Sequence, residues 1–212
     1  TTEGSMTKAN DSLGALPYDS YTIEELPCTA NEGYSLVKTS VIITRDSVSY
    51  DFGTLDDLKP EISTNAYDPT DGDSQIGVGD VAIADKVTYG GLSKGDQYRL
   101  NATLVDASTG KAILVDGKPV TATKTFTAQD TTGSEVVEMN VSTFGLGDKT
   151  ATVYEELYDL SSGTERLVAK HTDKDDTDQQ LQIVAPKIGT TASDGVDGDK
   201  NVVTDDTTTV VD

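Results

Sequence analysis

The chain of 212 residues is long enough for one or two domains, and its hydrophobic content of 35% is adequate for β-sandwiches, in which every strand exposes one face. Its 37 acidic and 16 basic residues give a net charge of −21, which disfavours nucleic acid and anionic membrane surfaces as partners because both would repel this charge. No stretch is apolar over the length of a membrane helix, and we expect no membrane insertion in this segment.

Short segments of alternating polar and apolar residues, separated by clusters of Gly, Asp, Asn and Ser, run through the whole sequence. None carries the sustained stripe of an amphipathic helix, so the pattern predicts an all-β protein built from sandwiches or barrels. Residues 16–55 predict three or four strands, which we interpret as the tail of a preceding domain covering residues 1–59. Cys28, the only cysteine, cannot form an internal disulfide, and we expect it to be a small buried side chain.

An internal repeat sets the domain boundaries. The stretch PEISTNAYDPTDGD, which begins at Pro60, returns as PKIGTTASDGVDGD from Pro186. One complete unit therefore spans residues 60–185, and residues 186–212 begin a second copy that is cut off. Because the chain lacks an initiator Met and stops inside a predicted strand, we expect it to be a piece of a longer protein.

Several polar side chains fall on the apolar faces of the predicted strands in the complete unit. His171, the only histidine, alternates with Leu167 and Ala169, and Glu155 alternates with apolar residues while Glu156 faces the other way. Burying polar groups costs free energy unless they are paired, so this set calls for a chemical explanation. Five functional side chains occupy inward positions on different strands: Thr64, Asp85, Glu155, His171 and Gln179.

The five side chains have complementary chemistry. The Thr64 hydroxyl becomes a nucleophile when a base takes its proton, and the unperturbed pKa of a histidine such as His171 suits that task near neutrality. The Gln179 carboxamide offers an electrophilic carbon with ammonia as the leaving group. Asp85 and Glu155, if close together, would share a proton and keep one neutral acid able to stabilise the oxyanion. The product would be a Thr64–Gln179 ester joining the first and last strands.

Each residue also has an ordinary structural interpretation. A buried threonine is usually a good strand former, an inward acid near a sheet end can bond loop amides, a lone histidine is usually a satisfied core residue, and Gln179 could cap a strand end. The chemical interpretation is favoured because the set contains each role once. An isopeptide crosslink is disfavoured, since Asn101 and Asn140 fall on outward faces. The loops DPTDGDS and HTDKDDTD lack the ligand spacing of a calcium loop, and no metal or cofactor is expected.

Four segments of the unit carry a family resemblance: PEISTNA, LVDGKPVTATKTFTA, TATVYEELYD and RLVAKHTDKDDTDQQ. They resemble the VaFE repeat, the Thr-Gln ester-bond domain found in tandem on surface adhesins of Gram-positive bacteria. The resemblance implies an Ig-like β-sandwich whose first and last strands are joined autocatalytically. It places the nucleophile on Thr64, the acceptor on Gln179, the base on His171 and the acid pair on Asp85 and Glu155.

The first strand of that family often reads Thr-Thr, as Thr190 and Thr191 do, whereas Asn65 holds the second position in the complete unit. Strand alternation favours Thr64, the first of the two positions, as the nucleophile. The N-terminal segment resembles the end of a Cna-B or SpaA-type prealbumin domain, and this match is carried by Tyr21, Glu25, Gly33 and Tyr34.

These interpretations lead to one expected function and one alternative. We expect a structural stalk repeat of an extracellular, cell-wall-anchored adhesin, with single-turnover ester formation and no other enzyme activity. Its partners would be neighbouring repeats of the same chain and a host ligand bound through other domains. The alternative is an Ig-like module that binds a glycan or a host protein and carries no crosslink.

Overall fold

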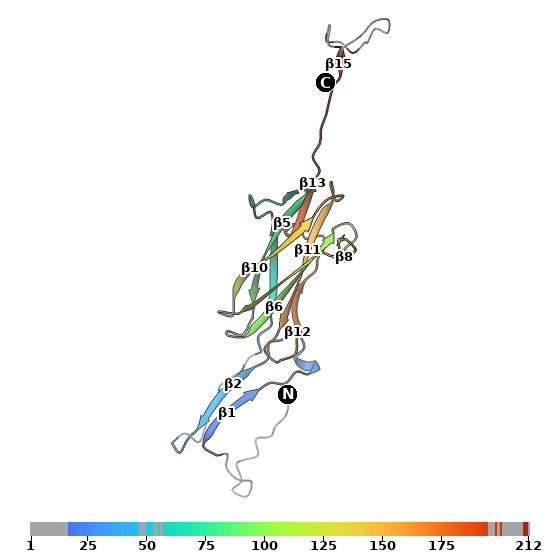
Figure 1. Cartoon of the computed structure of the whole chain (residues 1–212). Helices are drawn as coiled ribbons and strands as arrows, with labels where there is room; N and C mark the ends of the chain where they lie inside the picture. The colour runs from blue at the N-terminus through green and yellow to red at the C-terminus, as the bar shows by residue number, and fades with distance from the viewer. Residues whose placement is uncertain are drawn as a thin grey trace.

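The computed structural model describes residues 17–46, 50–52, 55, 57–194, 198, 200, 210 and 211. The protein is all-β, as the sequence pattern predicts, and an Ig-like sandwich forms its centre (Figure 1). The predicted domains 1–59 and 186–212 lie partly outside the described residues. In the described part of the chain, no helix is long and apolar enough to cross a membrane.

Two sheets face each other in the sandwich. The smaller sheet has the order β10-β5-β3, with β3 at Glu61–Tyr67, β5 at Asp80–Gly90 and β10 at Gly133–Ser142. The larger sheet has the order β4-β13-β11-β6-β9, and β12 also pairs with β11. Its strands are β4 (Gln75–Gly77), β6 (Gln97–Asp106), β9 (Thr121–Thr127), β11 (Thr150–Asp159), β12 (Arg166–His171) and β13 (Gln180–Val184). All of these pairings are antiparallel except that between β4 and β13.

Short elements complete the described chain. The hairpin β1 (Asp19–Glu24) and β2 (Lys38–Ile43), with the 3-10 turn η1 (Thr29–Asn31), precedes the sandwich. The ribbon β7 (Leu114–Val115) and β8 (Lys118–Pro119) and the 3-10 turn η2 (Thr177–Gln179) lie within it. Beyond it, β14 (Ser193–Asp194) pairs with β15 (Val210–Val211).

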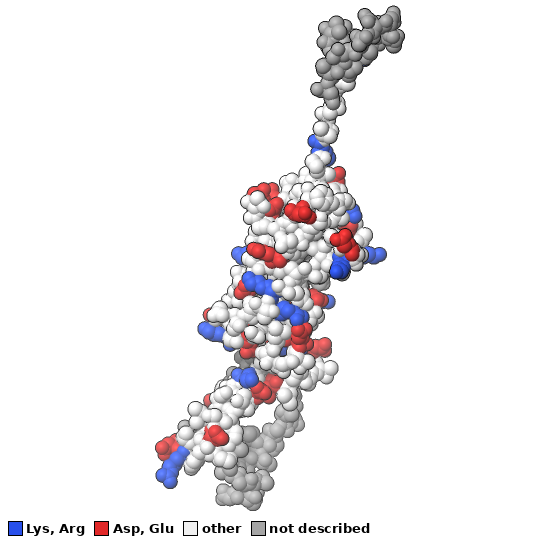
Figure 2. All heavy atoms as spheres, viewed as in Figure 1, with Lys and Arg blue, Asp and Glu red and all other residues white. Residues whose placement is uncertain are grey.

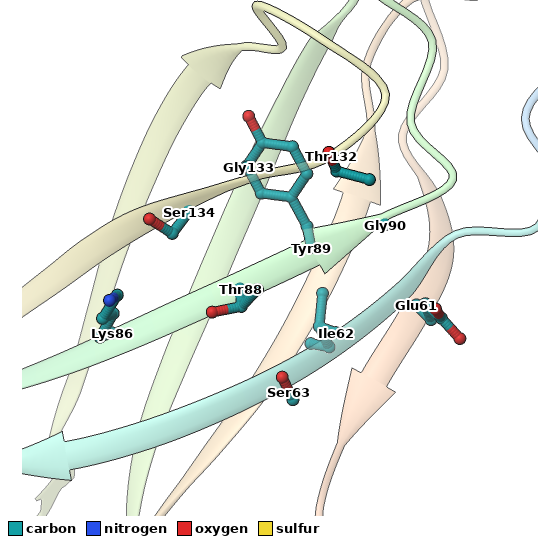
Figure 3. Close-up of a pocket in the computed structure, with 10 residues that line it drawn as sticks. All are labelled: Glu61, Ile62, Ser63, Lys86, Thr88, Tyr89, Gly90, Thr132, Gly133 and Ser134. Carbon is teal, nitrogen blue, oxygen red and sulfur yellow. The ribbon is translucent and has the colours of Figure 1, made fainter.

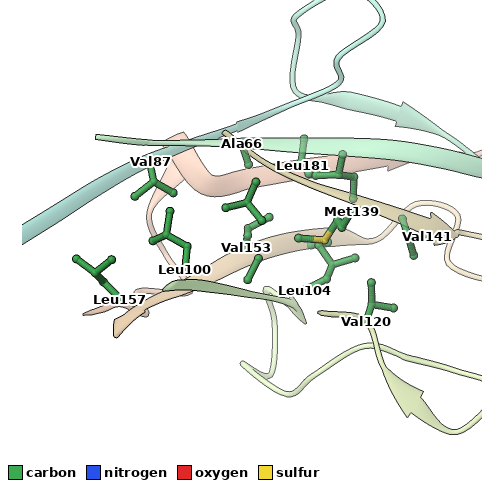
Figure 4. Packing of buried hydrophobic residues seen from close by; sticks show 14 of the residues in the cluster. Ala66, Val87, Leu100, Leu104, Val120, Met139, Val141, Val153, Leu157 and Leu181 are labelled. Carbon is green, nitrogen blue, oxygen red and sulfur yellow. The ribbon is translucent and has the colours of Figure 1, made fainter. Parts of the chain in front are cut away.

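Alternation within the strands produces the core between the two sheets. Successive residues of a strand point to opposite faces, so Val87 on β5, Leu100 on β6 and Val153 on β11 all point inward and are completely buried (Figure 4). Burial of such side chains contributes roughly 1.5–3 kcal/mol each. The same alternation controls where the polar side chains of these strands point.

Strands β12 and β13 divide one edge of β11 between them. β12 pairs with the second half of β11, where His171 lies opposite Glu155, and β13 pairs with the first half, where Gln180 lies opposite Thr152. The chain leaves the sheet between these two segments and forms η2. The middle of this edge therefore receives side chains from a turn rather than from a continuous strand.

A β-bulge changes the side-chain orientation that alternation predicts for part of β12. Leu157 pairs with Ala169 but Tyr158 pairs with Leu167, so Val168 is the extra residue. Ala169 and His171 share a face as expected, but Leu167 points to solvent and is 43% exposed. The prediction for Leu167 was wrong because the extra residue reverses the alternation on one side of the bulge.

The open edges of the sandwich are bridged by side chains rather than by a strand ladder. On the edge formed by β9 and β10, the Lys124 ammonium donates to the carbonyl of Val136 at 3.1 Å and pairs with the Glu135 carboxylate at 2.8 Å. On the opposite edge, Asn65 of β3 reaches the turn η2, where its side-chain nitrogen donates to the carbonyl of Asp178 at 3.2 Å. Each edge therefore has a polar tether between the two sheets.

The N-terminal hairpin contacts one end of the sandwich (Figure 1). The Ser35 hydroxyl donates to the carbonyl of Gly91 at 3.3 Å, and the Arg166 guanidinium donates to the carbonyl of Tyr34. Gly91 has a φ of +70°, and a Cβ there would lie 2.1 Å from the carbonyl oxygen of Lys59. The linking backbone therefore passes so close to this position that glycine is required.

Cys28 and the surface charges are the last features of the fold that bear on the predictions. Cys28 is exposed, because it lies in the irregular segment before η1 rather than on an apolar strand face, so its predicted burial was wrong. On the face shown in Figure 2, acidic and basic side chains are interspersed over the sandwich.

Candidate functional site

Four of the five predicted side chains are buried together near the β11 edge. Thr64 is 7% exposed, and Asp85, Glu155 and Gln179 have no exposed surface. Thr64 and Asp85 come from neighbouring strands of the smaller sheet, whereas Glu155 and Gln179 come from the larger sheet and its turn. Strand β3 lies against both β11 and η2. Strand alternation is confirmed for Thr64, Asp85 and Glu155; Gln179 is buried as predicted, but it lies in the turn η2 before β13 and not on a strand.

The turn η2 gives Gln179 its inward position. Asp176 precedes the turn and accepts a hydrogen bond from the N–H of Asp178 on its side chain at 3.0 Å, which is the usual way to begin a helical turn. The N–H of Gln179 donates to the carbonyl of Asp176 at 3.2 Å. These bonds close the turn so that Gln179 points inward while Thr177 and Asp178 stay exposed.

His171 lies at the rim of this cluster rather than inside the core. Its side chain is 22% exposed, and its Nε2 lies 2.7 Å from the Asp176 carboxylate oxygen. A carboxylate accepts hydrogen bonds, so in the neutral imidazole this contact places the hydrogen on Nε2 and the lone pair on Nδ1. His171 and Asp176 thus form an oriented pair in which the imidazole can act as a base.

Asp176 is a member of this cluster that the sequence reasoning missed. It lies in the acid-rich stretch HTDKDDTD, where four aspartates are candidates and no strand alternation separates them. Its only signal is position, because it precedes the turn that carries Gln179 and follows His171 closely. A search for turn-capping aspartates would have found it.

The acid pair has strongly perturbed ionisation. Burial raises the pKa of Asp85 to about 7, although the neighbouring Glu155 carboxyl, the Asn65 amide and His171 act in the opposite direction. Burial also raises the pKa of Glu155 to about 9, and the charge of Asp85 adds to this effect. The two carboxyl groups are thus close enough to influence each other, and burial keeps a proton on the pair at neutral pH.

The polar atoms of these residues share an unusual property. Among the described residues, eight buried side-chain nitrogen and oxygen atoms have no hydrogen-bond partner of normal geometry. One is Nε of Arg166, and the other seven are the polar side-chain atoms of Thr64, Asp85, Glu155 and Gln179. Leaving a buried polar group unpaired costs about 1–3 kcal/mol, so such atoms are rare in native proteins unless they have a chemical role.

A comparison with known protein families now adds to this geometry. Residues 60–183 match the family model described as the T-Q ester bond containing domain. The chain belongs to this family. The match confirms the resemblance to Thr-Gln ester-bond domains that the sequence motifs indicate.

Solved structures show the same fold as this ester bond domain. A bacterial adhesin from Mobiluncus mulieris, described as containing intramolecular disulfide, isopeptide and ester bond cross-links, matches in two crystal forms at 18% identity. One match has a TM-score of 0.53 and covers 64% of this chain and 59% of that chain, and the other has a TM-score of 0.50 and covers 60% and 57%. This chain thus spans less than two-thirds of the adhesin chains it resembles. No curated protein matches the sequence.

Other surfaces of the ester bond domain are separate from this cluster. An open hollow of about 720 Å³ lies on the outer face of β3, β5 and β10 (Figure 3). It is lined by Ser63, Lys86 and Thr88, which alternate with Thr64 and Asp85 along the same strands. In the part of the chain that the structure describes, no three His, Cys, Asp or Glu side chains are grouped as metal ligands.

Proposed function

We propose that the domain at residues 60–185 crosslinks itself through an ester between Thr64 and Gln179, and that it is a stalk repeat of a cell-wall-anchored surface adhesin. The observation that carries the crosslink is the set of seven unpartnered polar atoms on Thr64, Asp85, Glu155 and Gln179. A hydroxyl, a carboxamide and a carboxyl pair buried without partners are reactants rather than stabilising contacts.

The proposed reaction uses each group once. Nδ1 of His171, held by Asp176 through Nε2, takes the proton from the Thr64 hydroxyl as its oxygen attacks the side-chain carbon of Gln179. The protonated carboxyl of Glu155 donates a hydrogen bond to the resulting oxyanion and keeps its proton, consistent with its raised pKa. The carbon–nitrogen bond then breaks, the imidazolium returns its proton to the departing nitrogen, and ammonia leaves.

This chemistry runs once in each molecule and makes no enzyme. The nucleophile and the acceptor both belong to the chain, and the ester that forms occupies their places. Because Thr64 and Gln179 are buried, an external substrate has no route to the reactive atoms. No cofactor takes part in any step of the proposed reaction.

The stalk role follows from where the bond would lie. Thr64 is on the first strand of the domain and Gln179 is immediately before β13, its last strand. Tension applied to the two ends of the domain would pass through the ester and bypass the hydrogen-bonded strands between them. The likeness to an adhesin described as ester-crosslinked supports an extracellular setting, with neighbouring repeats as partners and a host ligand bound by other domains.

The intact mass of the purified chain tests the crosslink. The wild-type protein should be lighter than its sequence mass by one ammonia, and a protease digest should contain one peptide pair joined at Thr64 and Gln179. Thr64→Ala and Gln179→Ala should each have the full sequence mass, whereas Thr88→Ala, an exposed threonine of β5, should still lose ammonia. A wild-type chain at full mass would refute the proposal.

A further inference from the structure

Asn65 lies on β3, a strand of the smaller sheet that lies against the turn carrying the acceptor. It follows Thr64 on β3, and its exposed side chain donates to the carbonyl of Asp178, the residue before Gln179, at 3.2 Å. In the described residues, no other hydrogen bond joins β3 to η2 or β13. A single bond therefore links the residues that flank the nucleophile and the acceptor.

The geometry points to Asn65 as a positioning residue for ester formation, an inference that rests on the proposed crosslink. β3 belongs to the smaller sheet and Gln179 is carried by the larger one, so no strand ladder fixes the distance between Thr64 and Gln179 before they react. The hydrogen bond from the Asn65 side chain to the carbonyl of Asp178 restrains this distance from the side of β3. Asp176 fixes the same turn from the other side, through the N–H of Asp178 and the imidazole of His171.

Asn65 also contacts the acid pair. Its backbone N–H lies close enough to the Asp85 carboxyl to lower the pKa of that group, opposing the effect of burial. This favours an ionised Asp85 beside a protonated Glu155, which is the arrangement that leaves Glu155 as the donor. The side chain of Asn65 thus aligns the reacting atoms while its backbone biases the position of the shared proton.

The tether differs from an ordinary stabilising contact because it matters before the bond exists. Holding two reacting groups in place raises the rate by reducing the freedom lost on reaching the transition state. A hydrogen bond of ordinary strength corresponds to a rate change of about five-fold. After the ester forms, the covalent bond itself holds the two strands together, so the tether has little further effect.

The rate of crosslinking in the full chain tests this inference. The protein is made by cell-free synthesis with a short pulse of labelled methionine, and samples are stopped in detergent at intervals to separate linked from unlinked chains by mobility and mass. Asn65→Ala should crosslink about five-fold more slowly than wild type. Ser63→Ala is the matched control, because Ser63 is exposed on the same face of β3, and it should react at the wild-type rate.

Protease protection of the unlinked chains, measured in the same samples, separates positioning from folding. Slower crosslinking with protection equal to that of Ser63→Ala supports the inference. A rate equal to that of the control overturns it, and so does a slower rate that is matched by an equal loss of protection. If wild type itself forms no crosslink, the proposed function fails, which is a different result from equal rates in linked proteins.

Discussion

The strongest quantitative test compares Thr64→Val with Thr64→Ser. Valine has the shape of threonine without the hydroxyl, so Thr64→Val removes the nucleophile and leaves the buried volume nearly unchanged. Serine keeps the hydroxyl and should still crosslink. The pair therefore separates the covalent bond from the packing around it.

The size of the effect follows from the loop that the bond closes. The crosslink would join residues about 115 positions apart, and a loop of that length removes unfolded-state entropy worth about 5 kcal/mol at 25 °C. For a domain of this size, the unfolding entropy converts this into a fall of about 15–20 °C in the midpoint of thermal unfolding. Thr64→Val should thus melt about 15–20 °C below wild type, and Thr64→Ser close to it.

Scanning calorimetry on samples whose intact masses are known provides the measurement. The entropy argument is refuted if wild type is linked, Thr64→Val is unlinked, and their midpoints differ by less than about 3 °C. The crosslink itself is refuted if wild type and Thr64→Val both show full sequence mass. A linked Thr64→Val would show that a different hydroxyl reacts.

Three further predictions concern the groups around the bond. Asp176→Asn should fold but crosslink more slowly, because a neutral amide no longer favours the imidazolium that forms at His171; pulse-labelled mass analysis measures the rate, and an unchanged rate contradicts this role. Unlinked Thr64→Val should lose stability as pH rises from about 4 to about 9, because the folded chain keeps the proton of Glu155 (pKa about 9) after the unfolded chain has released it. When Glu155→Gln is added to Thr64→Val, the free energy of unfolding measured with urea should change less over the same pH range. An equally steep fall would count against a buried neutral acid at Glu155. Arg166→Ala should loosen the contact between the hairpin and the sandwich without affecting crosslinking. Nuclear magnetic relaxation should then show faster motion of the backbone amides in residues 17–46. Unchanged relaxation would show that the guanidinium does not hold this contact.

Strand alternation predicted the buried part of the site because the strands concerned are regular where it matters. Asp85 lies within an uninterrupted run of β5. Glu155 lies on β11 before the point that faces the bulge of β12, so side chains alternate regularly between the two faces of the sheet at both positions. Thr64 and Asn65 were assigned to opposite faces for the same reason, and the structure places Thr64 inside and Asn65 outside. In a regular strand, the position of a residue in the sequence determines which face of the sheet its side chain occupies.

The parts that failed all depend on irregular backbone. Leu167 was assigned to the wrong face because the bulge at Val168 reverses the alternation, and no residue type in that stretch marks a bulge. Asp176 was missed because the turn that brings it to His171 has no period to follow. Asn65 was not among the predicted site residues, and its proposed role depends on a turn more than a hundred positions away.

The interruption between β12 and β13 explains how the proposed reactants can meet at this edge. A continuous strand would have satisfied the whole β11 edge with backbone hydrogen bonds and sent alternate side chains to fixed faces. Leaving the sheet at His171 and returning at Gln180 allows the intervening turn to aim Gln179 inward and to place Asp176 against the imidazole. On the proposed function, the buried polar atoms without partners on both sides of this gap destabilise the fold before the ester forms. Ester formation then uses two of these groups, the Thr64 hydroxyl and the Gln179 carboxamide. The break in the strand is therefore the structural feature on which the chemistry depends, and closing it by shortening the 172–178 loop should abolish crosslinking while the flanking strands remain paired.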